Sequence, residues 1–311
     1  MKALVFTAPG VVEIQEVPDV VAGDGEVVVH VDRAGICGSE LHGIQTPGFR
    51  VPPLVMGHEF VGHTHDGQRV IVNPLISCGA CELCLAGHTQ VCRTRSIIGI
   101  HKAGGFAERV VVPLSSVHNL PDSIEWDRAA LIEPLANAVH AWALAGSPTG
   151  KRIGVIGCGP IGLACLEVAR DAGAALIACA DLSPERRTLA TSLGADMVGP
   201  SLEGELDVIF DAVGVAATRS TSVELLIPGG TTIWLGLATP DAGFDAANAI
   251  RFEKSVRGSF AYADAEFAEA IGLAPRLNLS WSTTYSLDEG AKIFTDLMNG
   301  QTTPVKALLR P

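Results

Sequence analysis

The sequence predicts an α/β protein of two domains: an irregular, mainly antiparallel β domain and a doubly wound parallel-sheet domain. Three observations support this prediction. The 311 residues correspond to about two domains at roughly 150 residues each. The first 120 residues carry short apolar runs separated by Gly, Pro and Asp, a pattern typical of antiparallel strands. From Lys151 onward, an apolar run, a glycine turn and a helical pattern repeat, which indicates βαβ units.

Composition and charge limit the classes of function. Hydrophobic residues make up 48% and charged residues 18% of the chain, as in a folded globular protein. The 22 basic and 34 acidic residues give a net charge of −12, so no nucleic-acid partner is expected, although a small anionic cofactor is still allowed. Because no apolar run of about 18 residues and no signal-peptide hydrophobic region occurs, we expect no membrane association and a cytoplasmic location.

The β part contains three clear strand candidates. They cover Val27–Val31, Arg69–Val72 and Ala107–Pro113. The segment Leu131–Gly146 has helical spacing and lies between the two parts, so we place the domain boundary within it. The segments after Tyr262 return to helical patterns and a closing strand, and they fit either domain on pattern alone.

Four of the eight cysteines form a cluster typical of a metal site. Cys78, Cys81, Cys84 and Cys92 lie within 15 residues, and four thiolates at such spacing suit a closed tetrahedral zinc site that leaves no position for chemistry. The alternative is a group of buried, reduced cysteines without metal. We therefore predict a structural zinc.

The second part opens with a nucleotide-binding pattern. Gly157, Gly159 and Gly162 form a G-x-G-x-x-G string between a strand pattern, Arg152–Ile156, and a helical pattern, Pro160–Ala172. In that context the glycines allow a tight turn, approach of a pyrophosphate and close packing of helix on strand. The helix N-terminus then favours the phosphates. An ordinary strand-to-helix turn is the alternative.

The next strand pattern ends in an acid that bears on the choice of cofactor. Asp181 lies 19 residues after Gly162, where a dinucleotide fold places the acid that binds the adenosine ribose hydroxyls. Because a carboxylate there repels a 2′-phosphate, we predict NAD rather than NADP. Arg186 follows one turn inside the next helix and either covers the adenine or is a solvated helix residue.

A second set of metal-binding residue types is dispersed. Cys37, Ser39 and His42 lie close together, His58 and Glu59 follow, and Glu133 opens the boundary helix. Three protein ligands of mixed type are typical of a catalytic zinc with an open position. Taken singly, Cys37 fits a core cysteine, His58 a loop histidine and Glu133 a helix N-terminal acid.

Five motifs in order, GICGSELHG, PLVMGHEFVG, the four cysteines, AALIEPLANAVHA and VIGCGPIGL, resemble the zinc-dependent medium-chain alcohol dehydrogenases. Glu133 in its EPL context and the late GSFAY segment are most similar to the polyol, threonine and butanediol dehydrogenase branch. The resemblance implies a GroES-like catalytic domain over residues 1–132 and 263–311, and a Rossmann domain over residues 133–262. It also implies a homo-oligomer, either a dimer or a tetramer.

The resemblance further implies the roles of individual residues. Cys37, His58 and either Glu59 or Glu133 would hold the catalytic zinc, which binds the substrate oxygen and lowers the pKa of the alcohol. Since Cys37 and one carboxylate already neutralise Zn²⁺, we expect only one of the two acids to bind at a time. Ser39 and His42 would pass the proton to solvent through the cofactor ribose. The residues expected to bind NAD are Gly157, Gly159, Pro160, Ile161, Gly162, Asp181 and Arg186.

Two departures from the family pattern stand near the zinc motifs. Glu40 replaces the aspartate that orients the zinc histidine in relatives, and a longer side chain there can shift the contacts around that histidine. Only HTHDGQ separates GHEFVG from RVIV, a contraction beside the metal loop. His63 and His65 in this segment are read as surface residues.

The leading functional prediction is transfer of a hydride from a secondary alcohol or polyol to NAD. A carbonyl reductase of the same fold is the alternative within enzymes, because the catalytic residues serve both directions. A nucleotide-binding homologue with weak catalysis is the alternative outside them, suggested by Glu40 and the contraction.

Overall fold

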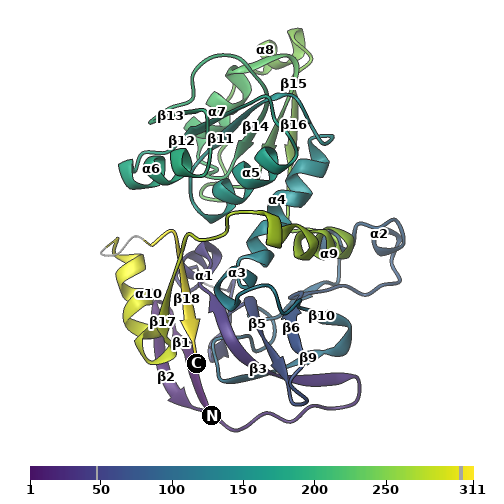
Figure 1. Ribbon diagram of the computed structural model, residues 1–311, viewed down its shortest axis with the longest axis vertical. Helices are drawn as coiled ribbons and strands as arrows, with labels where there is room; N and C mark the ends of the chain where they lie inside the picture. The colour runs from purple at the N-terminus through teal and green to yellow at the C-terminus, as the bar shows by residue number, and fades with distance from the viewer. Residues whose placement is uncertain (47, 301–303) are drawn as a thin grey trace. The chain divides into compact units, whose positions relative to one another are not determined.

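The computed structural model describes residues 1–46, 48–300 and 304–311. The chain divides into two compact units (Figure 1). Unit 1 comprises Met1–Glu133, Ala263–Pro275 and Leu279–Pro311, and unit 2 comprises Pro134–Tyr262 and Arg276–Asn278. Among the described residues, none of the helices has the length and apolar character needed to cross a membrane.

Unit 1 is built mainly from antiparallel strands. A seven-stranded sheet has the order β10-β6-β5-β3-β18-β17, with β9 also paired to β3, and a smaller sheet has the order β2-β1-β4. The strands are β1 (Lys2–Ala8), β2 (Val11–Glu16), β3 (Glu26–Gly35), β4 (Leu54–Val55), β5 (Glu59–Thr64), β6 (Arg69–Val72), β7 (Leu75–Ile76), β8 (Ser96–Ile97), β9 (Arg109–Pro113), β10 (Val117–Asn119), β17 (Ser282–Ser286) and β18 (Lys306–Arg310). The predicted strands near residues 27–31, 69–72 and 107–113 are confirmed.

Short helices join these strands. They are α1 (Gly38–Gly43), α2 (Glu82–Leu85), α3 (Trp126–Ala129), α9 (Asp264–Leu273) and α10 (Gly290–Met298), while α4 (Ile132–Leu144) crosses from unit 1 into unit 2. Alternating apolar residues of the strands pack into one core with α10, in which Phe6, Phe60, Phe106 and Phe294 are fully buried. This core fixes the strands that carry the metal-binding residues.

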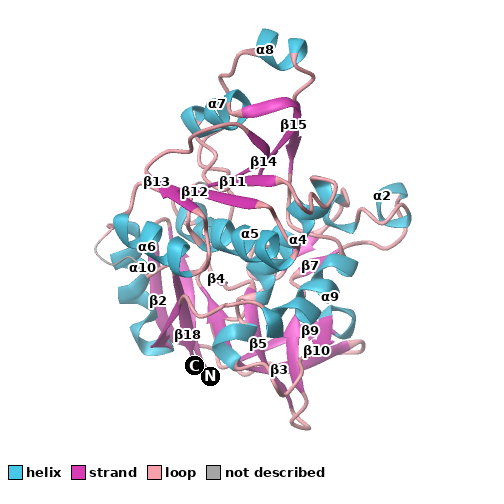
Figure 2. Cartoon of the chain, turned by 45° about the horizontal axis from the view of Figure 1, so that its top comes forward, coloured by secondary structure: helices cyan, strands magenta, loops and turns pink. Residues whose placement is uncertain are grey.

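The C-terminal segments belong to unit 1. β18 lies antiparallel to β3, with Leu308 opposite Gly35, and parallel to β17. The two ends of the chain lie side by side in both views (Figures 1 and 2). The strand nearest the C-terminus is therefore an inner strand of the larger sheet, next to the strand that leads to Cys37.

The contraction after Gly62 forms a closed hairpin. β5 and β6 pair antiparallel with Val61 opposite Ile71, and Thr64 donates its N–H to Gln68 O at 2.9 Å across the turn. His63 is half exposed, stacks on His30 and contacts Asp32 at 2.8 Å. The shortened segment thus closes without leaving unpaired strand ends beside the metal loop.

Unit 2 is a parallel sheet with helices. The strand order is β13-β12-β11-β14-β15-β16, the 3-2-1-4-5-6 order of a dinucleotide-binding fold. Its elements are β11 (Arg152–Ile156), α5 (Pro160–Asp171), β12 (Leu176–Ala180), α6 (Pro184–Ser192), β13 (Met197–Gly199), β14 (Leu206–Asp211), α7 (Ala216–Glu224), β15 (Leu226–Trp234), α8 (Ala246–Arg251) and β16 (Ser255–Gly258). The predicted doubly wound fold is confirmed.

Candidate zinc and nucleotide sites

Helix α1 presents the first group of predicted catalytic residues. Cys37 is its N-cap, in extended conformation, and Glu40 accepts the Cys37 N–H at 2.9 Å, which closes the first turn. Ser39 and His42 are three positions apart, so they share one face of the helix. The sequence therefore places the thiol, the hydroxyl and the imidazole on one short, capped element.

Three of the predicted ligands converge. One ligand atom each from Cys37, His58 and Glu59 lies within 4.8 Å of the others. Cys37 follows β3, His58 immediately precedes β5, and Glu59 is the first residue of β5, the strand paired with β3. A thiol, an imidazole and a carboxylate at this separation suit a zinc ion with one further position.

Glu40 orients the histidine of this group. Its buried Oε1 lies 2.9 Å from His58 Nδ1 and accepts the Gly57 N–H at 3.0 Å. Burial opposes ionisation of Glu40, but His58 and Arg50 outweigh it and lower the pKa of the carboxyl. With Nδ1 held by a carboxylate, Nε2 is the nitrogen left for a metal. The longer side chain thus reaches His58.

Glu133, the second acid predicted to be a ligand, is not in this group. It lies buried in the first turn of α4, outside the set of atoms within 4.8 Å. The geometry therefore brings Glu59 to Cys37 and His58.

Two buried cations that the sequence reading missed lie at this group. Lys306 Nζ forms an ion pair with the Glu59 carboxylate, and Arg50 donates to Ser39 O at 2.7 Å. Burial alone would lower the pKa of Lys306, but Glu59, Cys37 and Glu40 outweigh burial and raise it. No local motif marks either residue, because both reach the site only through the tertiary fold.

The two residues predicted to relay the proton differ in exposure. Ser39 Oγ is buried and has no hydrogen-bond partner among the described residues, whereas His42 is exposed at the last turn of α1. A buried hydroxyl without a partner is costly unless a ligand completes it. Ser39 therefore fits a group that meets a substrate, and His42 fits one that meets solvent.

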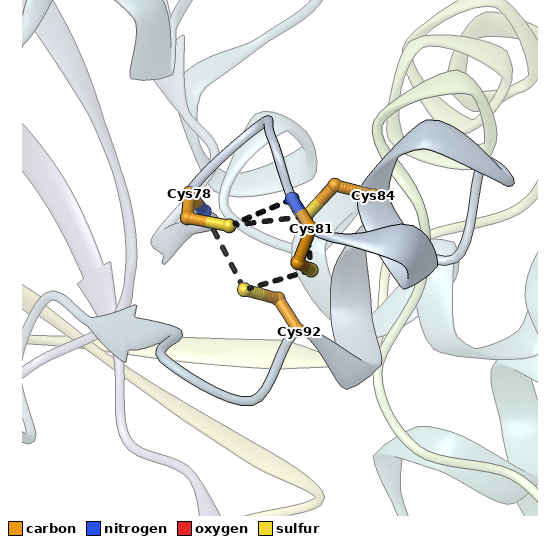
Figure 3. A group of neighbouring side chains, drawn as sticks. All are labelled: Cys78, Cys81, Cys84 and Cys92. Atoms are coloured by element: carbon orange, nitrogen blue, oxygen red, sulfur yellow. Dashed lines mark hydrogen bonds between the residues drawn. The ribbon is translucent and has the colours of Figure 1, made fainter.

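The four clustered cysteines have the geometry of a metal site (Figure 3). The Sγ of Cys81 lies 3.5 Å from that of Cys84 and 3.9 Å from that of Cys92, and Cys78 and Cys84 are 3.9 Å apart. A tetrahedral zinc with bonds of about 2.3 Å requires sulfur separations of about 3.8 Å. The donor set therefore fits a structural zinc.

Backbone N–H groups favour thiolates in this cluster. Cys78 N donates to Cys92 Sγ at 3.5 Å, and Cys81 N donates to Cys78 Sγ at 3.3 Å. The first of these bonds contributes most to lowering the pKa of Cys92 to about 6. Burial and the neighbouring thiols raise the pKa of Cys84 to about 11. A cation among the four sulfurs would stabilise them all as thiolates.

The glycine loop of unit 2 has the predicted form. Gly157 has φ +90°, Gly159 caps α5 in extended conformation, and Pro160 is the first residue of the helix. A Cβ on Gly162 would overlap the Gly157 carbonyl oxygen. The N-terminal turn of α5, with Ile161, therefore approaches the end of β11 closely enough to receive phosphates at its N–H groups.

Asp181 lies at the end of β12, beside this loop. Its carboxylate accepts the Cys158 N–H at 2.7 Å and the Ser183 N–H at 2.8 Å. Arg186 Nη1 lies 4.0 Å from the same carboxylate, on a side chain about one-third exposed. The loop thus presents an acid and a cation where a dinucleotide fold binds the adenosine ribose.

Asp211 is a further loop residue that we did not predict from the sequence. Asp211, fully buried at the end of β14, accepts the N–H groups of Val213 and Gly214 at 2.9 and 3.0 Å and the Thr218 hydroxyl at 2.9 Å. An acid followed by Gly three positions later, after a buried strand, was the available signal. Asp211 orders the loop that follows the fourth strand.

Replacing Gly162 with alanine is expected to weaken NAD binding at least about tenfold and to destabilise unit 2 by about 1–3 kcal/mol, as overpacking does. Gly159→Ala is the matched control, because the only atom within 4 Å of a Cβ there is Arg186 Nη1, at the 4.0 Å limit. That variant should keep its melting temperature and lose only affinity. Calorimetric titration with NAD and thermal melting separate the two effects, and unchanged affinity in Gly162→Ala would contradict the assignment.

Fold and sites together define a nicotinamide-dependent zinc dehydrogenase. Residues 23–122 match the alcohol dehydrogenase GroES-like domain and residues 160–276 match the zinc-binding dehydrogenase family. The chain belongs to the zinc-dependent medium-chain alcohol dehydrogenases, and its relatives include polyol and threonine dehydrogenases.

Individual relatives agree with this assignment. The chain is 34% identical to the L-galactonate-5-dehydrogenase of Escherichia coli, over 82% of this chain and 81% of that one. It is similar to the crystal structure of galactitol-1-phosphate dehydrogenase from E. coli (TM-score 0.92, 30% identity, all of both chains). A zinc-binding dehydrogenase from Sinorhizobium meliloti bound to NADP has a TM-score of 0.93 at 29% identity, covering all of this chain and 99% of that one.

These findings confirm the predicted family, the GroES-like and Rossmann fold classes, and zinc with a nicotinamide cofactor. The chain is an NAD(P)-dependent, zinc-binding alcohol dehydrogenase that oxidises CH–OH groups.

Proposed function

We propose that this enzyme oxidises a secondary hydroxyl of a polyol or sugar-derived alcohol, with NAD as hydride acceptor. The observation that carries the proposal is the convergence of Cys37, His58 and Glu59 within 4.8 Å, with Glu40 fixing the histidine. Relatives named for galactonate and galactitol 1-phosphate support a polyhydroxylated substrate. The shared chemistry is a CH–OH group within a hydroxylated chain.

We assign metal binding and proton transfer at this site to different residues. Cys37, His58 and one carboxylate would hold the zinc, with Glu59 as the acid in place and Glu133 as the acid that exchanges with it. When bound, zinc supplies a Lewis acid that lowers the pKa of the substrate hydroxyl. Ser39, whose Oγ has no partner among the described residues, accepts the hydroxyl proton as it gives up its own hydroxyl proton. Exposed His42 passes that proton to solvent.

The proposal also covers the domain boundaries, the cellular location and the oligomeric state. The functional domains would follow residues 1–132 with 263–311 and residues 133–262. None of the eight cysteines is in a disulfide, which favours a reducing compartment such as the cytoplasm. The edge strand β16, with three of its four residues exposed, offers backbone groups for a partner chain, which supports a homo-oligomer.

Preference for NAD should be measurable at Asp181. The kcat/KM with NAD is expected to exceed that with NADP at least about tenfold, since like charges brought together in a site cost several kcal/mol. Asp181→Ala should remove most of this preference, because Arg186 would remain near the 2′ position. Glu185→Gln, which removes an exposed acid four residues along, should keep this preference. A higher kcat/KM with NADP in the wild-type enzyme would show the role of Asp181 to be wrong.

A substrate screen tests the proposed function. NADH formation would be followed at saturating NAD with sugar alcohols, sugar acids, small diols and 3-hydroxy amino acids, and the reverse reaction with the corresponding ketones. Turnover of a polyhydroxylated alcohol supports the proposal. Turnover only of ketones would contradict the proposed direction of the reaction, and a zinc-loaded protein that turns over none of these compounds would contradict the proposed substrate class.

A further inference from the structure

The buried ion pair of Lys306 and Glu59 depends on three adjacent strands. Glu59 on β5 stands opposite Gly35 on β3, and Leu308 on β18 stands opposite Gly35 from the other side. A Cβ on Gly35 would lie 2.8 Å from Lys306 Cε and would overlap the Glu59 carboxylate. Because Gly35 has no side chain, Lys306 of β18 and Glu59 of β5 can meet across the middle strand, β3.

The pair is fully enclosed. The side chains of Lys306 and Glu59 are 1% and 2% exposed. A buried ion pair adds little stability compared with apolar residues of the same volume, because both charges lose their hydration. Stability alone therefore gives little reason for a charged pair at this place in the sheet.

The Glu59 carboxylate is also one of the groups that could bind the catalytic metal. It lies within 4.8 Å of Cys37 and His58, so an ion held there and the ammonium of Lys306 attract the same group. An ammonium on a carboxylate reduces the negative charge that the carboxylate offers to a metal. The strength with which Glu59 binds a metal therefore depends on Lys306 of β18.

We propose that Lys306 is a positioning residue that holds the Glu59 carboxylate between β3 and β18 and keeps it a weak, exchangeable ligand of the catalytic metal. The inference rests on the proposed function in one respect, that Cys37 and His58 hold zinc. A weak third ligand yields its place to another acid or to substrate, whereas a strong one blocks that exchange. Lys306 would therefore lower metal affinity in favour of turnover.

The test measures zinc retention and needs no substrate. Zinc at the Cys37 site is identified as the ion that Cys37→Ser lacks, and its affinity is measured by chelator competition on the purified full chain. Lys306→Met, of similar volume and without charge, should hold this zinc about tenfold more tightly than wild type, the scale on which groups around a metal act. Lys2→Met removes a lysine from an exposed ion pair with Asp288 in the same unit and should leave zinc affinity unchanged.

A second comparison isolates the path through Glu59. Glu59→Gln and the double variant Glu59→Gln/Lys306→Met should hold zinc with equal affinity, because the carboxylate on which the lysine acts is gone. If Lys306→Met alone does not fold, Lys306→Gln, which can still donate a hydrogen bond to the buried Glu59 carboxylate, takes its place and should likewise hold zinc more tightly than wild type.

Three results would overturn the inference. Zinc affinity in Lys306→Met within twofold of wild type, or weaker, contradicts it. So does a difference above threefold between Glu59→Gln and the double variant. Equal zinc content in wild type and Cys37→Ser would instead overturn the proposed zinc site, and the inference with it.

Discussion

Cys37→Ala is expected to lower kcat by at least about a thousandfold while NAD still binds. The Lewis acid that Cys37 helps to hold supplies several kcal/mol of charge stabilisation, and about 4 kcal/mol corresponds to a thousandfold in rate. The glycine loop and Asp181 lie in unit 2, so cofactor affinity has no reason to change. Steady-state kinetics and calorimetric titration with NAD provide the two measurements.

Cys165→Ala is the matched control for this experiment. Cys165 is a buried cysteine of α5, and burial raises the pKa of its thiol to about 12, so it is inert as a metal ligand. That variant should retain kcat. Activity of Cys37→Ala within tenfold of wild type would exclude Cys37 as a ligand of the catalytic zinc.

The largest effect on stability is expected from the four-cysteine cluster. Cys81→Ser should lose one zinc per chain and destabilise unit 1 by at least about 3 kcal/mol, since loss of a metal is among the more damaging changes. For a unit of the size of unit 1, that corresponds to a fall in melting temperature of roughly 6–12 °C. Metal analysis and thermal melting check both parts.

Metal removal gives the control for this variant. A strong chelator should lower the melting temperature of the wild-type protein toward that of Cys81→Ser and change the variant much less. Lost activity with unchanged melting would contradict a structural role, because it would place the cluster in catalysis rather than in the fold.

Local spacing allowed most of the two sites to be predicted. The cysteines from Cys78 to Cys92 lie so close in sequence that almost any compact loop brings them together. The glycine loop and Asp181 likewise belong to one strand, helix and strand unit, whose chemistry depends on neighbours in sequence. Glu59 and Glu133 could not be distinguished in this way, because the choice depends on which acid the pairing of β5 with β3 brings to Cys37.

Tertiary contacts account for what the sequence did not reveal. Lys306 reads as the first residue of an ordinary closing strand, and only the pairing of β18 with β3 brings it to Glu59. Arg50 lies in the loop between α1 and β4, and no sequence motif marks it as part of the site. The length of Glu40 suggested altered contacts around His58, yet the distance between α1 and the start of β5 suits the longer side chain.

The inner position of β18 has a consequence for how the protein is made. Gly35 leaves the ribosome 271 residues before Lys306, which at about 5–20 residues per second is roughly half a minute. During that interval the four-cysteine cluster, contained within 15 residues, can already capture its metal. The catalytic ligands Cys37, His58 and Glu59 are synthesised even earlier, whereas Lys306, which by our proposal weakens the hold of Glu59 on the metal, is among the last residues made. The catalytic site is therefore expected to hold a metal more tightly before β18 joins the sheet than after it.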